Sequence, residues 1–311
     1  MKKYIAKRLF VSVITLLVIL LVLFILMDLM PGSPFNDEKL TEQQKAVLYA
    51  KYGLDKPILQ RFGIYAKNML TGDFGVSYTI NKNFAVRDML AGRLKVSLLV
   101  GAMAMVFGTV IGLLLGIAAA LKHNTWVDNL CSVLSVLGVS IPSYVCGLLL
   151  CYYLAYRFGW FPILYNKALP VFSLILPALA LSVSPTANIA RFTRSEMIDV
   201  MNSDYITLVQ SKGVKDREVI IKHALRNTMI PIITVMGPIL VNLLTGSSVI
   251  EKIFGIPGIG NLMIMGIQNN DYNVTITCSF IYSVMYVVMM LIVDILYGVI
   301  DPRIRIAKEE K

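Results

Sequence analysis

The chain has 311 residues, of which 57% are hydrophobic and 15% are charged, and its formal net charge is +10. Soluble domains have about 45–50% apolar and about 25% charged residues, so the composition excludes an ordinary soluble protein and predicts one integral membrane domain. The four cysteines lie in apolar runs without a CxxC pair, and the two histidines have no ligand cluster around them, so neither a disulfide framework nor a metal site is expected.

The first predicted membrane span is a charge-free run of 19 residues from Leu9 to Met27. As a helix it would be about 28 Å long, enough to cross a hydrocarbon core. A secretory signal peptide is the alternative, because basic residues precede the run. However, the run exceeds the usual apolar part of a signal peptide, and no small-x-small cleavage site follows it in DLMPGSP. We therefore expect residues 1–30 to form a cytoplasmic N-terminus and a retained first transmembrane helix.

Residues 31–95 form a long polar segment in which two surface helices are predicted. The stretch TEQQKAVLYAKYG has a capping box made by Thr41 and Gln44. The stretch KPILQRFGIYAKNMLTG has Pro57 in a first turn and Gly72 after the last turn. We expect a small structured cap on the extracytoplasmic side.

Five further apolar runs follow residue 95, broken by a charge only at Asp294. Each is long enough to cross a bilayer as a helix. The runs are Val96–Leu121, Asn129–Tyr156, Ala168–Ala190, Thr228–Ile250 and Asn273–Ile300. The predicted fold class is an all-α integral membrane protein with six transmembrane helices, a long first extracytoplasmic loop and five of the helices within residues 96–311.

Glycines and prolines recur inside these runs. Gly108, Gly112 and Gly116 are four residues apart in GTVIGLLLG, a spacing that lets another helix approach closely. We expect packing within the chain there in preference to a dimer face. Prolines that interrupt or kink spans are typical of transport proteins whose backbone lines a cavity. The prolines concerned are Pro142, Pro177, Pro185, Pro231 and Pro238.

Basic residues are distributed unevenly among the segments that join the runs. Four lie before the first run, one beside His123, seven from Arg191 to Arg226 and four in the tail, whereas the short opposite loops carry two and one. Short loops rich in Lys and Arg stay in the cytoplasm. Residues 31–95 carry ten basic residues, but long loops cross largely regardless of charge. We expect a protein of the cell membrane with both termini and the loop 191–227 in the cytoplasm.

The segment DYITLVQSKGVKDREVIIKHALRNTMIP, residues 204–231, is too polar to enter lipid and too short to be a domain. Its first half predicts a helix with Tyr205, Leu208 and Val209 on one face and Gly213 as a left-handed end. A second helix follows the glycine. Such a helix suits a groove on another protein, and a helix lying on anionic lipid is the alternative. DNA binding is disfavoured because both ends are tied to membrane spans.

Six stretches in order resemble the permease subunits of ABC importers of the dipeptide, oligopeptide and nickel class, specifically the first of the two paired permeases. The resemblance covers almost the whole chain. The stretches are YGLDKPILQRFGIYAKNMLTGDFGVS, GVSIPSYVCGLLL, ARFTRSEMIDVMNSDYITLVQSKGV, HALRNTMIPIITVMG, IFGIPGIGNLM and LIVDILYGVIDPRIR.

By this resemblance, the helix that ends at the glycine is a coupling helix, which docks in a cleft of an ATPase subunit. The importer motif has a Glu-Ala-Ala triplet before the glycine, and Thr207, Leu208 and Val209 stand there instead. The expected coupling residues are Asp204, Tyr205, Leu208, Val209, Lys212, Gly213, Ala224, Leu225, Arg226, Asn227 and Pro231. The resemblance also implies a second permease, one or two ATPase subunits and an extracytoplasmic substrate-binding protein as partners, in addition to membrane lipid.

The chain has no Gly-x-x-x-x-Gly-Lys-Ser/Thr phosphate loop, so ATP hydrolysis is expected in the partner subunits and neither a catalytic site nor a cofactor is expected here. One alternative is an ion-coupled secondary transporter with Asp294 as its titrating carboxylate, but no internal inverted repeat is apparent. Another is an intramembrane enzyme, which would need Ser-His, HExxH or paired aspartates within spans. No nucleic-acid partner is expected.

The expected transport path is polar without a strong fixed charge, which suits peptides of mixed sequence. Nickel chelates stay open as the substrate, since in this class the binding protein is expected to choose it. The candidate path residues are Ser140, Ser143, Tyr144, Asn188 and Asn242, each with helix–helix hydrogen bonding as its alternative. The stretch IFGIPGIGNLM is expected to dip into the membrane as an outer gate, or to form a plain turn. Its candidate gate residues are Gly255, Pro257, Gly258 and Gly260.

Overall fold

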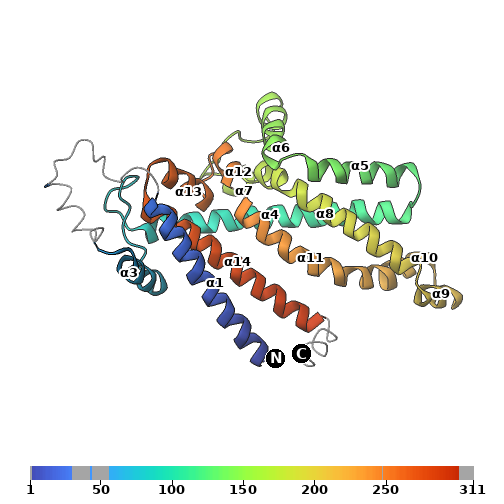
Figure 1. Ribbon diagram of the computed structural model, residues 1–311. Coiled ribbons are helices and arrows are strands. Elements are labelled where there is room, and N and C mark those ends of the chain that lie inside the picture. Colours follow the sequence, from blue (N-terminus) through green and yellow to red (C-terminus); the bar gives the residue numbers. More distant parts are fainter. Residues whose placement is uncertain (1, 30–42, 44–55, 247, 301–311) are drawn as a thin grey trace. The chain divides into compact units, whose positions relative to one another are not determined.

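The structure is a computed structural model that describes residues 2–29, 43, 56–246 and 248–300 (Figure 1). In this part the regular secondary structure is helical, apart from an isolated antiparallel bridge between Val76 and Ala85. The helical membrane fold predicted from the sequence is therefore confirmed. The chain divides into two compact units, which are described separately: unit 1 is residues 1–97 with 257–291, and unit 2 is residues 98–256 with 292–311.

Unit 1 contains helices from both ends of the chain. They are α1 (Lys2–Leu29), α3 (Ile58–Thr71), the start of α4 (Val86–Leu121), α13 (Ile259–Gln268) and most of α14 (Tyr272–Ile300). Pro57, predicted in the first turn of α3, is the N-cap residue one position before it. As predicted, Gly72 follows the last turn, in the left-handed conformation at φ +80°. The helix predicted around Thr41 and Gln44 lies outside the described residues.

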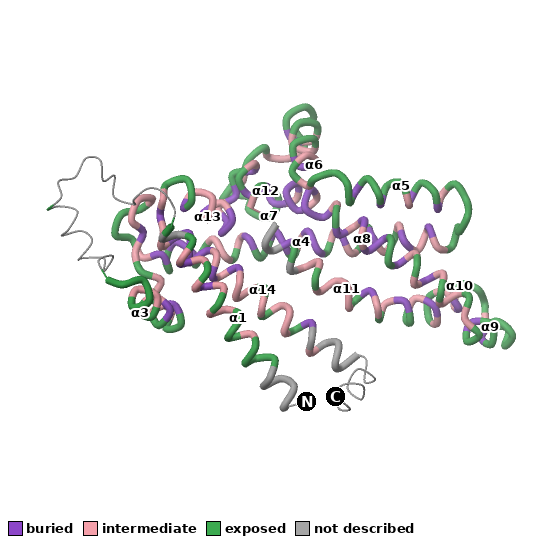
Figure 2. The backbone as a smooth tube through the Cα atoms, in the orientation of Figure 1, coloured by how far each residue is buried: buried purple, intermediate pink, exposed green. Residues whose placement is uncertain are grey.

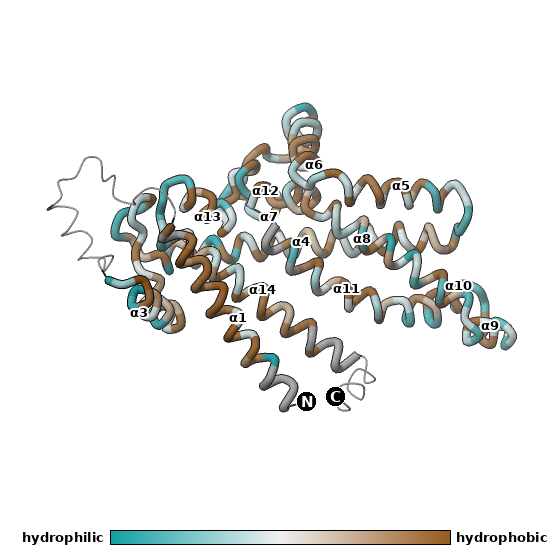
Figure 3. The backbone as a smooth tube through the Cα atoms, viewed as in Figure 1, coloured by the Kyte–Doolittle hydropathy of each residue, from teal (hydrophilic) through white to brown (hydrophobic). Residues whose placement is uncertain are grey.

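Two apolar clusters form the core of unit 1. One joins α1, α3 and α14 through Leu20, Phe24, Ala66, Met69, Ile276 and Phe280. The other joins α4, α13 and α14 and includes Val86, Leu90, Ile259, Leu262, Val274 and Cys278. Most residues of α1 are hydrophobic, whereas α3 alternates between polar and apolar positions (Figure 3).

A buried carboxylate fastens the loop before α4 to the start of α14. Asp271 Oδ2 accepts hydrogen bonds from Ser77 Oγ at 2.5 Å and from the backbone N–H groups of Tyr78, Thr79 and Ile80 at 3.0, 3.0 and 3.2 Å. Asp271 is fully buried. Successive N–H groups that converge in this way form a nest for an anion, and here the chain supplies the anion itself.

Unit 2 is built around one long helix, α8 (Ile175–Met201), which α5, α6 and α11 all contact. In Figure 2, α8 is largely buried while α5 is exposed along most of its length. The other elements are α5 (Trp126–Ser140), α6 (Ser143–Leu150), the π-helical stretch Cys151–Arg157, α7 (Pro170–Ser173), α9 (Asp204–Ser211), α10 (Asp216–Glu218), the π-helical stretch Val219–Ala224, α11 (Leu225–Gly246) and α12 (Ser248–Ile253).

The three glycines of α4 lie against α8, so the close approach they predicted is packing within the chain. A Cβ atom added at Gly108 would lie 2.6 Å from the Cβ of Pro185, and one at Gly112 would lie 2.9 Å from the Cβ of Ile189. The backbones approach more closely than any larger residue would allow, as in small-residue helix seams generally.

Four described helices are long and apolar enough to cross a membrane, or five if the bent pair α5 and α6 with the stretch after it counts as one span. The four are Arg8–Leu26, Val86–Leu121, Asp216–Leu240 and Tyr272–Val293. The pair bends by 103° at the break that contains Pro142. α8 is not among these helices; its C-terminal half carries Arg191, Arg194 and Glu196. The count of six spans therefore stays a prediction.

Candidate functional site

The segment expected to meet a partner subunit forms the short helix α9, which begins after Ser203 and has an acidic residue, Asp204, in its first turn. An acidic group at this position complements the partial positive charge of a helix N-terminus. The helix ends as predicted, because Gly213 adopts the left-handed conformation at φ +76° and its N–H donates to Gln210 O at 2.9 Å. α9 and α10 lie at the same end of unit 2 as the turn between α4 and α5 (Figure 1).

α9 has one face packed on its own chain and one face open. Ile206 and Val209 are buried in an apolar cluster with Met197 of α8 and with Val219 and Ala224 after the turn. The prediction that Val209 shares an exposed face with Tyr205 and Leu208 is therefore wrong: Val209 is 8% exposed, whereas Tyr205 and Leu208 are 42% and 57% exposed. Of these three residues, only Tyr205 and Leu208 lie on the open face.

The two halves of the segment are joined by a hydrogen bond between side chains. Tyr205 Oη lies 2.7 Å from His223 Nδ1. At the next turn, Thr228 Oγ1 donates to Ala224 O at 2.9 Å within the buried part of the segment. The first contact links α9 to the stretch before α11, and the second lies where that stretch joins α11.

The other expected coupling residues are distributed over both sides of the segment. Ala224 is buried and Leu225 and Pro231 are half-buried, so these three support the segment. The exposed residues are Asp204, Lys212, Gly213, Arg226 and Asn227. The exposed set therefore includes two cations and one acid.

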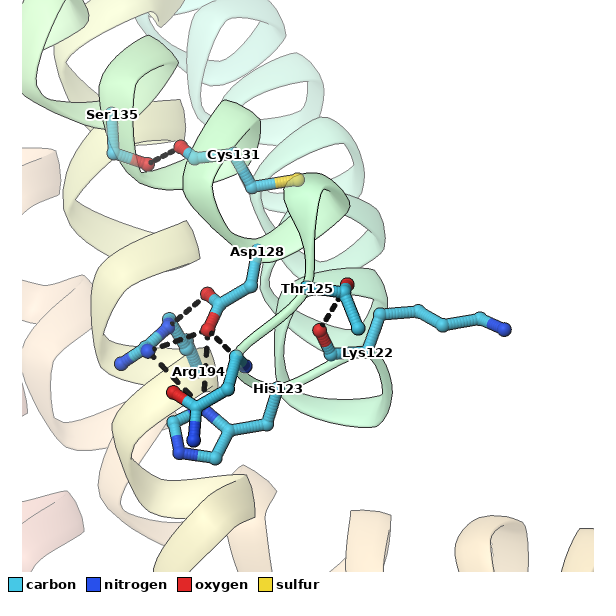
Figure 4. Close-up of polar contacts among 8 residues, drawn as sticks. Lys122, His123, Thr125, Asp128, Cys131, Ser135 and Arg194 are labelled. Carbon is cyan, nitrogen blue, oxygen red and sulfur yellow. Dashed lines mark hydrogen bonds and ion pairs between the residues drawn. The ribbon is translucent and has the colours of Figure 1, made fainter.

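A polar cluster that the sequence did not single out ties α5 to α8 (Figure 4). Arg194 Nε donates to Asp128 Oδ1 at 2.5 Å and Arg194 Nη2 donates to Asp128 Oδ2 at 2.8 Å. The N–H of Asn124 donates to the same Oδ2 atom at 3.0 Å, and His123 Nδ1 lies 3.1 Å from it. This is a paired, charge-assisted contact of the kind that arginine makes with carboxylates.

The candidate path residues are spread over α5, α6, α8 and α11. Ser140 Oγ donates to Val136 O and Asn188 Nδ2 donates to Ser184 O, both at 2.9 Å, so these two bond within their own helices. Ser143 is half-buried at the start of α6, and Tyr144 and Asn242 are exposed. Their role in a transport path stays a prediction.

The candidate gate residues form a turn between two short helices. Gly255 adopts the left-handed conformation at φ +62° after α12. Pro257 is half-buried, Gly258 caps the N-terminus of α13, and Gly260 is buried in its first turn. The local structure is thus a turn, and its position as a gate stays a prediction.

A family model described as "Binding-protein-dependent transport system inner membrane component" matches residues 112–306. The chain belongs to this family. It is therefore a permease, the membrane component of a transport system. The family match covers all of the polar cluster, α9 and the segment after it.

Similar proteins carry consistent names. The dipeptide transport system permease protein DppB of Lactococcus lactis subsp. cremoris is 45% identical over 98% of this chain and 100% of that protein. The DppB protein of Bacillus subtilis is 41% identical over 99% and 100%. The oligopeptide transport system permease protein OppB of Escherichia coli K12 is 38% identical over 98% and 100%.

Solved structures of ABC transporters share the fold of this permease. The inward-facing MetNI methionine ABC transporter matches with a TM-score of 0.59 and 16% identity over 68% of this chain and 96% of that chain. An amino acid ABC transporter matches with a TM-score of 0.53 and 16% identity over 67% and 92%. At this identity the likeness concerns the fold alone.

Proposed function

We propose that the chain is the permease subunit of an ATP-driven importer and forms part of the path for dipeptides or oligopeptides. The names of the relatives at 45%, 41% and 38% identity, all dipeptide or oligopeptide transport permeases, support this substrate class. The nickel-chelate alternative is not favoured by these names. The proposed partners are a second permease, one or two ATPase subunits and an extracytoplasmic binding protein that delivers the peptide.

The observation that carries the coupling part of the proposal is the two-sided packing of α9. Its inner face is held by Met197 and Val219 of the same chain, so the helix is positioned before any partner arrives. Its open face presents Leu208, which is 57% exposed, and Tyr205, which is 42% exposed although its ring lies beside that of His223. A short helix with an apolar face of this kind fits a groove on another subunit.

Two further elements of the proposal follow from the sequence. The chain has no phosphate loop, so hydrolysis of ATP belongs to the partner subunits and the chain itself is not an enzyme. The excess of Lys and Arg in the termini and in residues 191–227 supports a cytoplasmic position for all three, on the side where ATP is available.

Leu208→Glu tests the docking role directly. We expect it to lower both the amount of ATPase that copurifies with the permease and the rate of peptide uptake by about tenfold or more, because a charge replaces an apolar side chain in a closed interface. Gln210→Glu is the matched control, since it adds the same charge at an exposed position on the opposite side of α9. Wild-type copurification and uptake by the Leu208 variant would rule out docking through this face.

The ion-coupled alternative is tested by the source of energy. Uptake that continues in the presence of a protonophore and stops when ATP is depleted is expected for the importer. The opposite pattern would favour an ion gradient and would direct attention to Asp294, whose side chain lies outside the described residues.

A further inference from the structure

Helices α5 and α8 are joined at two separate levels. At one, a Cβ atom added at Gly138 would lie 3.0 Å from the Cβ of Ala187, so the two backbones are in close contact. At the other, the Asp128 carboxylate is paired with the Arg194 guanidinium. Between the two levels lies a cavity of about 200 Å³ that is lined in part by Cys131, Ser132, Ser135, Ala190 and Arg191. At the end of α5 and α8 that is nearer α9, the two helices are therefore joined by the ion pair and not by apolar packing.

The ion pair is sheltered from water on its acidic side. The Asp128 side chain is 3% exposed and the Arg194 side chain is 30% exposed. Asp128 also holds the turn before it, through the N–H of Asn124 and the ring of His123. A pair with two parallel N–H bonds has a defined direction, unlike a single flexible ion pair at a surface. The first turn of α5 must therefore follow Arg194 when α8 moves.

The C-terminal part of α8, beyond Arg194, contacts α9. Met197, about one turn beyond Arg194 on α8, is fully buried against Ile206 and Val209 on the inner face of α9. A displacement of α9 therefore acts on α8 at Met197, and the nearest rigid link from α8 to α5 is the pair at Arg194. Contiguous packed and ion-paired groups of this kind can carry a displacement between two sites.

We infer that Arg194 and Asp128 are positioning residues that transmit the movement of α9 to α5, and so couple ATP use to the membrane path. This inference rests on the proposed docking role of α9. α5 ends at Ser140, a candidate path residue, so a shift of its first turn is delivered along a helix of 15 residues to the break at Pro142. Without the pair, α9 would still dock, but its displacement would no longer be transmitted in full to α5.

The test uses the importer purified with its partner subunits and reconstituted in liposomes with its binding protein and a dipeptide. Peptide uptake and ATP hydrolysis are measured on the same vesicles, and their ratio is compared among variants. We expect Asp128→Asn, Arg194→Gln and the double variant to retain the ATPase subunits but to lower the ratio of peptide transported to ATP hydrolysed by about fivefold or more, the lower range for coupling between sites.

The double variant separates positioning from folding. Each single substitution leaves one charge of the pair without its counter-charge, whereas the double substitution leaves two neutral amides at these positions. We expect the double variant to regain thermal stability without regaining the ratio. Asp199→Asn is the matched control, because it removes an exposed acidic charge from the same helix as Arg194 and should leave the ratio unchanged.

A wild-type ratio in the double variant would overturn the inference. Leu208→Glu in the same vesicles distinguishes this from failure of the docking proposal. If Leu208→Glu removes the ATPase subunits while the double variant keeps a wild-type ratio, docking holds and the positioning role is rejected. If Leu208→Glu leaves the assembly and its uptake intact, the docking proposal fails and the inference that rests on it fails as well.

Discussion

A Cβ atom added at Gly116 of α4 would lie 2.5 Å from the Cβ of Thr193 on α8 and 2.6 Å from the carbonyl oxygen of Ala190. Thr193 is fully buried, and the carbonyl belongs to the helix backbone, so neither neighbour can move aside freely. The same seam continues at Gly112 and Gly108. Helix α8 is thus held against α4 along about two turns, directly before the segment that carries α9.

Gly116→Ala is expected to destabilise the permease by about 1–3 kcal/mol, because the added methyl group forces two helix backbones apart. Gly92→Ala is the matched control on the same helix, since a Cβ atom there meets nothing within 4 Å. Alanine should leave stability unchanged or raise it slightly at that position. Thermal denaturation in detergent measures both effects. Equal unfolding midpoints for the two variants would contradict close packing of α4 on α8 at Gly116.

Asp271→Ala is expected to lower the stability of unit 1 by about 3 kcal/mol or more, because it leaves three partly buried N–H groups, those of residues 78–80, without their acceptor. Asp88→Asn, which removes a charge from an exposed position in the first turn of α4, should cost less than about 1 kcal/mol. Limited proteolysis of the loop before α4 reports the local effect. An Asp271 variant with wild-type resistance would show that the nest does not hold the loop.

Gly213→Ala is expected to weaken ATPase copurification, because a left-handed backbone costs alanine about 1 kcal/mol and shifts the end of α9. Gly213→Asn should restore most of it, since asparagine tolerates this conformation better. A Cβ atom at this position meets nothing within 4 Å, so conformation and not crowding is tested. Equal copurification by both variants would mean that the turn is not needed for docking.

Structural features that are signalled by neighbouring residues in the chain were predicted correctly from the sequence. Gly72 and Gly213 end helices in the left-handed conformation, as their positions after apolar periodic stretches indicated. The glycine spacing in α4 predicted a close helix contact, because four residues return the chain to nearly the same face. In each case the sequence signal itself lies within one or two turns of the residue.

The exposed face of α9 could not be assigned from its own sequence. Tyr205, Leu208 and Val209 share a helical face by spacing, but Ile206 is also apolar, so the helix has more than one apolar direction. The contact with Met197 and its neighbours decides that Ile206 and Val209 point inward. Likewise, the pairing of Asp128 with Arg194 joins residues that are distant in the chain. The sequence showed only that both charges lie near the ends of apolar runs, without showing that they pair.

The π-helical stretch Val219–Ala224 lies between the turn at Gly213 and α11. A π-helix closes its hydrogen bonds one residue further along than an α-helix, so such a stretch holds an extra residue relative to a continuous α-helix. Deleting one residue there would leave a regular helix and keep everything before it at nearly its present angle around the α11 axis, because six residues of π-helix wind about as far as five residues of α-helix. The direction of the docking face around that axis therefore depends on residue number and helix type together. A chimera that exchanges this segment between permeases would keep its docking face aligned if a one-residue difference in length is matched by a change between π-helix and α-helix.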